Sequence, residues 1–117
     1  MKKPEIKKLD KMWGEAIHSL YDCCAVCKKK DVRLEAHHIF TRGKQSTRWD
    51  LENGILLCSL HHKFDKNLSA HTAPRNFWLW LEKEKGIDWV NKLEEKSNLI
   101  TKHNFEEVKN CLCKKTK

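Results

Sequence analysis

The residues with the clearest chemistry in this 117-residue chain are its six cysteines and seven histidines. Cys24 and Cys27 are separated by two residues, and the same spacing separates Cys58 from His61. A two-residue gap lets a tight turn direct both ligand atoms toward one ion, and two such turns complete a tetrahedron around Zn²⁺. The spacing therefore favours a structural zinc ion held by these four residues over free or redox-active thiols.

The other three cysteines have no such pattern. Cys23 lies beside Cys24, but only Cys24 keeps the two-residue gap to Cys27, so we interpret Cys23 as a small buried thiol. Cys111 and Cys113 are one residue apart in a lysine-rich tail and are interpreted as spare thiols at a helix end. A disulfide framework would need an oxidising compartment, and because no secretion signal is visible we expect a cytoplasmic protein.

Two adjacent pairs of histidines, His37–His38 and His61–His62, form a second group, with Asn53 between the pairs. A neutral imidazole can act as a general base near pH 7 and can bind a divalent metal ion. Neighbouring residues on a regular strand face opposite sides, so the first pair can share one site only where the strand ends or bulges. The members of the second pair are adjacent and could exchange the roles of zinc ligand and second-site ligand.

Several of the remaining candidates have simple structural interpretations. Asn53 precedes Gly54, and Asn-Gly is a common turn pair, which is compatible with a further role for the asparagine. Trp49 could intercalate between bases, but core packing is the interpretation that we favour. Three histidines carry no motif and are interpreted as ordinary surface residues, namely His18, His71 and His103.

Apolar periodicity predicts the elements that must position these side chains. The central stretch is expected to form a strand over residues 32–40, a polar loop, a second strand over 55–58 and a helix that begins at Ser59. Flanking helices are predicted over residues 4–21, 71–86, 87–99 and 103–113.

The order of these elements predicts a small α+β protein of one domain. A basic N-terminal helix (1–22) would precede a zinc knuckle with a β-loop-β-α core (23–68), and a C-terminal helical segment (69–117) would follow. No linker rich in glycine, serine or proline divides the chain, and no internal repeat is present.

The chain is basic, with a formal net charge of +8. Between residues 28 and 48, seven Lys and Arg stand against two acidic residues, a local excess of +5 that favours a surface facing nucleic-acid phosphate. Arg42, Lys44 and Arg48 are the candidates to contact DNA phosphate, although Arg48 could instead pair with Asp50. No run approaches the ~18 apolar residues of a membrane span, so no membrane association is expected.

These motifs, in this order, resemble the HNH endonucleases with a zinc-stabilised ββα-metal core. They are CAVC at 24–27, EAHHIF at 35–40 and LENGILLCSLHH at 51–62, and the resemblance covers roughly residues 23–66. The stretch HHIFTRGKQSTRWDLENGILLC is also similar to small phage-type HNH proteins, in which a helical tail with an aromatic segment like NFWLWL follows. The resemblance implies a ββα-metal core here, in a phage-encoded protein or one of a bacterial host cytoplasm.

The resemblance also implies an activity, namely hydrolysis of DNA phosphodiesters that leaves 5′-phosphate and 3′-hydroxyl ends. His38 would be the general base that takes a proton from water, and Asn53 would hold it in its working orientation. His62 would bind the catalytic divalent cation (Mg²⁺, Mn²⁺, Ni²⁺, Co²⁺ or Zn²⁺) with His37 as co-ligand, and Asp65 could add an oxygen ligand. Structural Zn²⁺ would then be bound by the remaining four residues, Cys24, Cys27, Cys58 and His61.

Two other functions are compatible with the sequence. One is a zinc-stabilised DNA-binding accessory protein without catalysis, in phage recombination or packaging, and the other is a zinc-dependent protein-interaction knuckle. The intact set of His38, Asn53 and His62 favours the enzyme, because a pure binding protein has no need to keep it. Specificity, nicking against double-strand cleavage and oligomeric state cannot be read from the sequence, and a partner protein could supply specificity.

Overall fold

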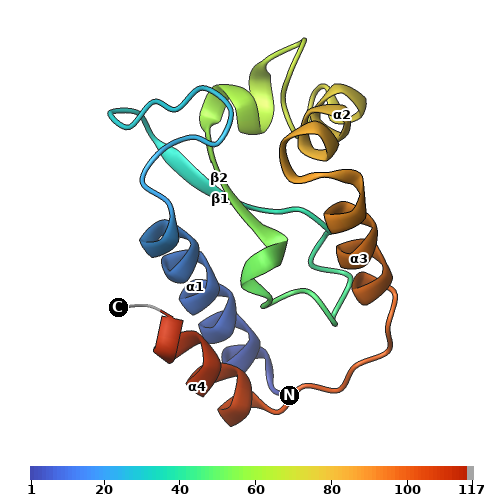
Figure 1. The fold of residues 1–117 in the computed structure, drawn as a ribbon. Helices are drawn as coiled ribbons and strands as arrows, with labels where there is room; N and C mark the ends of the chain where they lie inside the picture. The colour runs from blue at the N-terminus through green and yellow to red at the C-terminus, as the bar shows by residue number, and fades with distance from the viewer. Residues whose placement is uncertain (116–117) are drawn as a thin grey trace.

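Two antiparallel strands form a small central sheet, and helices pack on both of its faces (Figure 1). The computed structural model describes residues 1–115. Along the chain the elements are α1 (Lys3–Leu20), β1 (Leu34–His38), the 3₁₀-helix η1 (Leu51–Asn53), β2 (Gly54–Cys58), the π-helix η2 (Leu60–Phe64), α2 (Pro74–Lys85), α3 (Ile87–Ser97) and α4 (Phe105–Lys115).

The two strands pair in regular register, from Leu34 opposite Cys58 to His38 opposite Gly54. The first strand is shorter than the predicted 32–40. It ends at His38 because the backbone after His38 bonds to the Asn53 side chain: the Phe40 N–H donates to Asn53 Oδ1 at 2.7 Å. Residues 39–50 then run as a long loop between the strands, and η1 leads that loop into β2.

The predicted fold class, a small α+β protein with helices flanking a two-stranded sheet, is confirmed. The helix expected to begin at Ser59 is a single wide turn, which closes with the Asp65 N–H donating to the Leu60 carbonyl at 2.8 Å. The four other predicted helices are present with ends that differ by a few residues. The division into a basic helix, a knuckle with its core and a helical segment stays a prediction.

One core lies between α1, α4 and one face of the sheet. Leu9, Trp13 and Ile17 recur at helical spacing on α1, and each is at most 2% exposed. They pack with Leu56 of β2 and Leu112 of α4. Figure 1 shows α4 running alongside α1, so the first and last helices of the chain pack together on this face.

The second core lies on the opposite face of the sheet. Because side chains alternate along a strand, Ile55 and Leu57 of β2 point away from Leu56 and meet Phe77 and Leu81 of α2. The tryptophans of α2 and α3 are partly buried against this core, namely Trp78, Trp80 and Trp89. Within residues 1–115, no helix has both the length and the apolar character that crossing a membrane requires.

Candidate metal centres and the imidazole site

Cys24, Cys27, Cys58 and His61 lie together, with their ligand atoms all within 4.8 Å of one another. The Cys58 sulfur is 3.2 Å from His61 Nδ1 and 3.8 Å from the Cys27 sulfur, and the Cys24 sulfur is 3.9 Å from the same nitrogen. Separations of this size are those of neighbouring ligands around one tetrahedral Zn²⁺ with Zn–S bonds of about 2.3 Å. The structure thus brings together the four residues that the spacing grouped, and Cys23 is not among them.

A tight turn forms the first half of this Cys/His cluster. The Lys28 N–H donates to the Cys24 carbonyl at 2.9 Å, and Lys28 adopts a left-handed φ of 64°, which reverses the chain. The Ala25 N–H donates to the Leu56 carbonyl at 2.9 Å. The turn is therefore fastened to β2, the strand that ends in Cys58, and this contact places the two halves of the cluster side by side.

The thiols of the cluster have unequal pKa values. Burial by itself raises the pKa of Cys24, but backbone hydrogen bonds at Cys27, Cys58 and Val26 lower it to about 6. Burial raises the pKa of Cys58. The thiolate is the form of cysteine that binds zinc, so Cys24 is ready to bind the ion at neutral pH, whereas binding at Cys58 requires release of a proton.

Three histidines form a second group, the imidazole cluster of His37, His62 and His71. Nε2 of His62 lies 3.2 Å from Nδ1 of His37 and 3.1 Å from Nε2 of His71. Phe77 of α2 packs edge-on against the His37 ring, with centroids 5.8 Å apart. Three ring nitrogens from β1, η2 and the segment before α2 therefore converge on one point, on the α2 side of the sheet.

Glu35 fixes the orientation of His62. It lies two residues before His37 on the same face of β1, and its Oε1 accepts a hydrogen bond from Nδ1 of His62 at 2.9 Å. This hydrogen bond lowers the pKa of Glu35, so the carboxylate is ionised at neutral pH. Because Nδ1 of His62 carries the proton, the lone pair of Nε2 points into the cluster, as in metal-binding histidines that are held by carboxylates.

Two imidazoles of the cluster, those of His37 and His71, have lowered pKa values. Burial, reinforced by the neighbouring His62, His71 and His38, lowers the pKa of His37 to about 3. Burial also lowers the pKa of His71, helped by its proximity to His62 and Lys63. Neutral imidazole is the form that coordinates a metal ion, so the donor set fits a divalent cation.

The structure adds His71 to the site and does not bring Asp65 to it. The sequence indicated an ordinary surface histidine at position 71, and the side chain is indeed exposed, but its ring meets His62 edge-on with centroids 4.6 Å apart. The Asp65 carboxylate instead accepts the backbone N–H groups of Asn67 and Leu68 at 2.7 and 2.9 Å. Asp65 therefore caps the turn that follows η2.

The chain after η2 folds back onto it, and this return places His71. The His71 N–H donates to the His62 carbonyl at 3.0 Å, and the Ala70 N–H donates to the His61 carbonyl at 3.0 Å. An irregular turn over residues 65–70 produces both contacts. No periodic spacing predicts such a turn, so the sequence carried no signal for this third histidine.

His38 lies on the other side of β1 from His37, as the alternation of a regular strand requires. Its ring stacks on Trp13 of α1, with centroids 3.7 Å and planes 9° apart, and its Nε2 is 2.9 Å from the Arg48 carbonyl oxygen. A carbonyl can only accept, so Nε2 carries the proton and Nδ1 keeps its lone pair. Burial lowers the pKa of His38, and the hydrogen bond to Arg48 partly opposes this shift.

Asn53 closes the loop that follows His38. It is fully buried, its Oδ1 accepts the Phe40 N–H at 2.7 Å, and its Nδ2 donates to the carbonyls of Phe40 and Thr47 at 2.9 and 3.1 Å. Gly54 has an extended φ of −121°, so this Asn-Gly pair does not form a left-handed hairpin turn. Within the described residues no hydrogen bond joins Asn53 to the His38 ring, and the amide acts on the loop backbone instead.

The basic residues of the loop differ in exposure. Arg48 is turned inward with a 15% exposed side chain, and it forms a two-point ion pair with Asp10 of α1 at 2.8 and 3.0 Å. Its charge is therefore matched by Asp10, not by the suggested partner Asp50, and its contact with DNA phosphate stays a prediction. Arg42 and Lys44 lie on the surface, with Arg42 3.7 Å from the Asp10 carboxylate.

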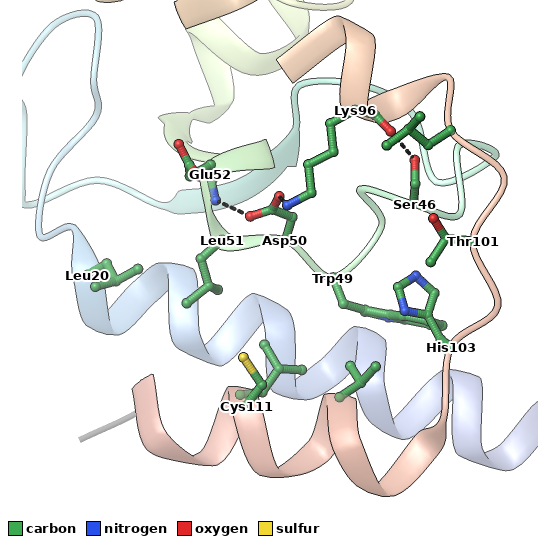
Figure 2. A pocket seen from close by; sticks show the side chains of 13 residues that line it. Leu20, Ser46, Trp49, Asp50, Leu51, Glu52, Lys96, Thr101, His103 and Cys111 are labelled. Atoms are coloured by element: carbon green, nitrogen blue, oxygen red, sulfur yellow. Dashed lines mark hydrogen bonds and ion pairs between the residues drawn. The ribbon is translucent and has the colours of Figure 1, made fainter. Parts of the chain in front are cut away.

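A pocket of about 570 Å³ opens on the other side of this loop, between η1, the end of α3 and α4 (Figure 2). Trp49 and Leu112 are among its apolar walls, and Figure 2 shows Ser46 bonded to the backbone of Lys96. His103 lies beside Trp49, with ring centroids 5.1 Å apart. None of the residues that line the pocket belongs to either cluster, so it lies apart from the candidate site.

Comparison with known proteins identifies the central segment. The sequence model of one family, described as HNH endonuclease, matches residues 24–70. No curated protein and no solved structure matches the chain. The matched segment holds the Cys/His cluster, His37, His38, Asn53 and His62, and the family indicates a nuclease-type, metal-dependent function. Residues 24–70 of this chain are therefore similar to the HNH endonuclease family, and this match supports a nuclease-type function.

Proposed function

We propose that the protein is a metal-dependent endonuclease that hydrolyses DNA phosphodiesters, with His38 as the general base and the imidazole cluster as the site of the divalent cation. The observation that carries this proposal is the convergence of three imidazole ring nitrogens, which all lie within 4.8 Å of one another. His37 and His38 are consecutive at the end of β1, so the cluster and the base flank the same end of the sheet.

The donor set supports the choice of cation. Ring nitrogens 3.1 and 3.2 Å apart have the separation of neighbouring ligands on one ion with bonds of about 2.0–2.1 Å. Three protein ligands leave coordination positions free for substrate, and the bound cation would neutralise charge that develops on the phosphoryl oxygens. Imidazole donors suit Mn²⁺, Co²⁺, Ni²⁺ or Zn²⁺ better than Mg²⁺, which prefers oxygen.

His38 is suited to take a proton from the attacking water. Because its Nε2–H is donated to the Arg48 carbonyl, the free lone pair is on Nδ1, and this is the atom that we assign as the base. Its lowered pKa keeps the ring neutral at pH 7. A correctly placed general base contributes about 10²–10⁴-fold in rate.

The Cys/His cluster supports a structural role for zinc. It offers four protein ligands with no position left for substrate, which distinguishes it from the imidazole cluster. It joins the turn at residues 24–28 to the end of β2 and the start of η2, and η2 also carries His62 of the imidazole cluster. We therefore assign Cys24, Cys27, Cys58 and His61 to zinc, and His62 to the catalytic cation.

DNA is the proposed substrate because HNH nucleases act on DNA and because exposed basic residues lie on the loop that follows His38. Arg42 and Lys44 on the loop after β1 would contact phosphate, and Lys28, Lys29 and Lys30 add exposed charge near the Cys/His cluster. Arg48 is omitted from these contacts because Asp10 already neutralises it.

The test is nicking of supercoiled plasmid by zinc-loaded protein with each divalent cation added in turn. His38→Gln keeps an N–H donor for the Arg48 carbonyl but has no base, so it should lose about 10²–10⁴-fold in rate. His18→Ala, an exposed histidine elsewhere on α1, is the matched control and should retain full activity. If neither wild type nor His38→Gln nicks the plasmid with any cation, the endonuclease proposal is wrong and the DNA-binding accessory protein remains.

A further inference from the structure

The orientation of the proposed base depends on a loop, because the acceptor for His38 is the backbone carbonyl of Arg48. If that carbonyl moves, no other hydrogen bond among residues 1–115 holds the proton on Nε2, and Nδ1 becomes the protonated nitrogen in part of the molecules. The position of Arg48 in the loop therefore decides which ring nitrogen is basic.

Asp10 of α1 holds the loop at that point. Its Oδ1 accepts from Arg48 Nε at 3.0 Å and from Trp49 Nε1 at 2.9 Å, and its Oδ2 accepts from Arg48 Nη2 at 2.8 Å. Two-point pairing of a guanidinium with a carboxylate is among the strongest and most directional polar contacts in proteins. One carboxylate thus fixes two consecutive loop residues, and both lie next to the carbonyl that His38 uses.

Trp13, one helical turn after Asp10, supports the other side of the arrangement. Its ring stacks on His38, and its Nε1–H donates to the Asp50 carbonyl at 2.9 Å. The indole reaches His38 because Gly54, the residue paired with His38 across the sheet, has no side chain. A Cβ at Gly54 would lie 2.7 Å from Cζ2 of Trp13.

We propose that Asp10 is a positioning residue for His38: through Arg48 and Trp49 it keeps the Arg48 carbonyl on Nε2, while Trp13 from the same helix face holds the ring. Asp10 and Trp13 both precede the family segment at 24–70, so α1 is a working part of the site and not only a cover for the core. This inference rests on the proposed role of His38 as the base.

The first measurement is the tautomer of His38 in the metal-loaded, full-length protein, read from the ¹⁵N chemical shifts of its ring. Wild type should show the Nε2–H form. Asp10→Ala, and Asp10→Asn in case the smaller side chain prevents folding, should show a mixture of tautomers. Glu15→Ala removes the same charge from an exposed position of the same helix and should leave the shifts unchanged.

The second measurement separates turnover from binding. Asp10→Asn should lower kcat by about 10–100-fold without raising KM for DNA, because loss of the acidic charge beside Arg42 does not weaken a contact with phosphate. Adding Arg48→Ala to Asp10→Asn should cost little more, since both act on one loop. Zinc content and thermal midpoint, compared with Glu15→Ala, report whether each variant is folded.

Retention of the Nε2–H tautomer in folded Asp10→Asn would overturn the proposal, whether or not kcat falls. A tautomer shift with a selective loss of kcat would support it. The tautomer measurement does not require catalysis. If the wild-type protein cleaves no DNA, the proposed function is wrong, but the tautomer still tests whether Asp10 positions His38.

Discussion

Nε2 of His71 lies 3.1 Å from Nε2 of His62, nine residues earlier in the chain, and the ring is exposed on its outer side. Glu35 accepts a hydrogen bond from His62, and His37 is half-buried with Phe77 edge-on against its ring. His71 is therefore the exposed member of the imidazole cluster, and it contributes the third ring nitrogen from the surface. It also lies one residue beyond the segment that the family model matches.

Removal of His71 should lower the affinity for the divalent cation more than the stability of the fold. His71→Ala deletes one of three nitrogen donors, and its exposed position leaves little cavity behind. Cation affinity should fall by at least about 10–100-fold, the range seen when only the partner of a ligand is lost. Titration calorimetry on zinc-loaded protein measures this, with His18→Ala as the control. Unchanged affinity would exclude His71 as a ligand.

The identity of the cation should follow from the donor atoms. The imidazole cluster offers nitrogen and no oxygen ligand, because the Asp65 carboxylate is bonded to the backbone of its own turn. We expect Mn²⁺, Co²⁺, Ni²⁺ or Zn²⁺ to support nicking at concentrations ~10-fold or more below those that Mg²⁺ requires. Nicking assays over a concentration series of each ion decide the matter. Equal potency of Mg²⁺ would argue for an oxygen-rich site elsewhere.

Two neighbouring cysteines should behave differently. Cys24→Ser removes a ligand from the Cys/His cluster, whose zinc binding would supply about 10–16 kcal/mol of apparent free energy, so the variant should lose zinc and most of its folded structure. Cys23→Ser leaves the four ligands in place and should keep zinc and fold. Metal analysis and circular dichroism compare the two variants. Loss of zinc from both variants would contradict the assignment of Cys24 alone as the first zinc ligand.

The four zinc candidates illustrate what the sequence could predict. Each half of the cluster is a local turn, so a two-residue gap was a sufficient signal for Cys24 with Cys27 and for Cys58 with His61. The alternation of a strand likewise set the condition that His37 and His38 share one site only where the strand ends or bulges. In the regular register of β1, which ends at His38, the two lie on opposite sides. Both signals depend only on backbone geometry over a few residues.

The contributions of Asp10 and His71 depend on tertiary structure instead. Asp10 meets Arg48 only because α1 packs across the face of the sheet that carries His38, and 38 residues separate the pair. The sequence placed Arg48 on DNA phosphate because its charge was visible and its partner was not. No rule of sequence spacing predicts a contact between Asp10 on α1 and Arg48 on the loop after β1.

The nicking rate at saturating cation should fall on the acid side with a midpoint below pH 6.5. The base acts in its neutral form, so activity is lost as pH falls through the pKa of His38, which burial lowers from the usual 6.5. Trp13→Leu would expose the ring and move this midpoint up toward 6.5, whereas Glu15→Ala should leave it in place. A rate profile measured from pH 5 to 8 tests the shift, and a wild-type midpoint above 6.5 would contradict it.

Two glycines of the same core should respond in opposite ways to alanine. At Gly54 the added Cβ would lie 2.2 Å from Cδ1 of Ile17 and 2.7 Å from Cζ2 of Trp13, so α1 must shift. The expected loss is about 1–3 kcal/mol of unfolding free energy, with a fall in kcat because Trp13 is pushed against His38. At Gly14 nothing lies within 4 Å of the added atom, and alanine should stabilise the helix by about 0.5–1 kcal/mol. Urea unfolding and kcat of both variants decide it: if Gly54→Ala unfolds less readily than wild type, α1 is not seated as closely on the sheet as the contact requires, and its hold on His38 fails with it.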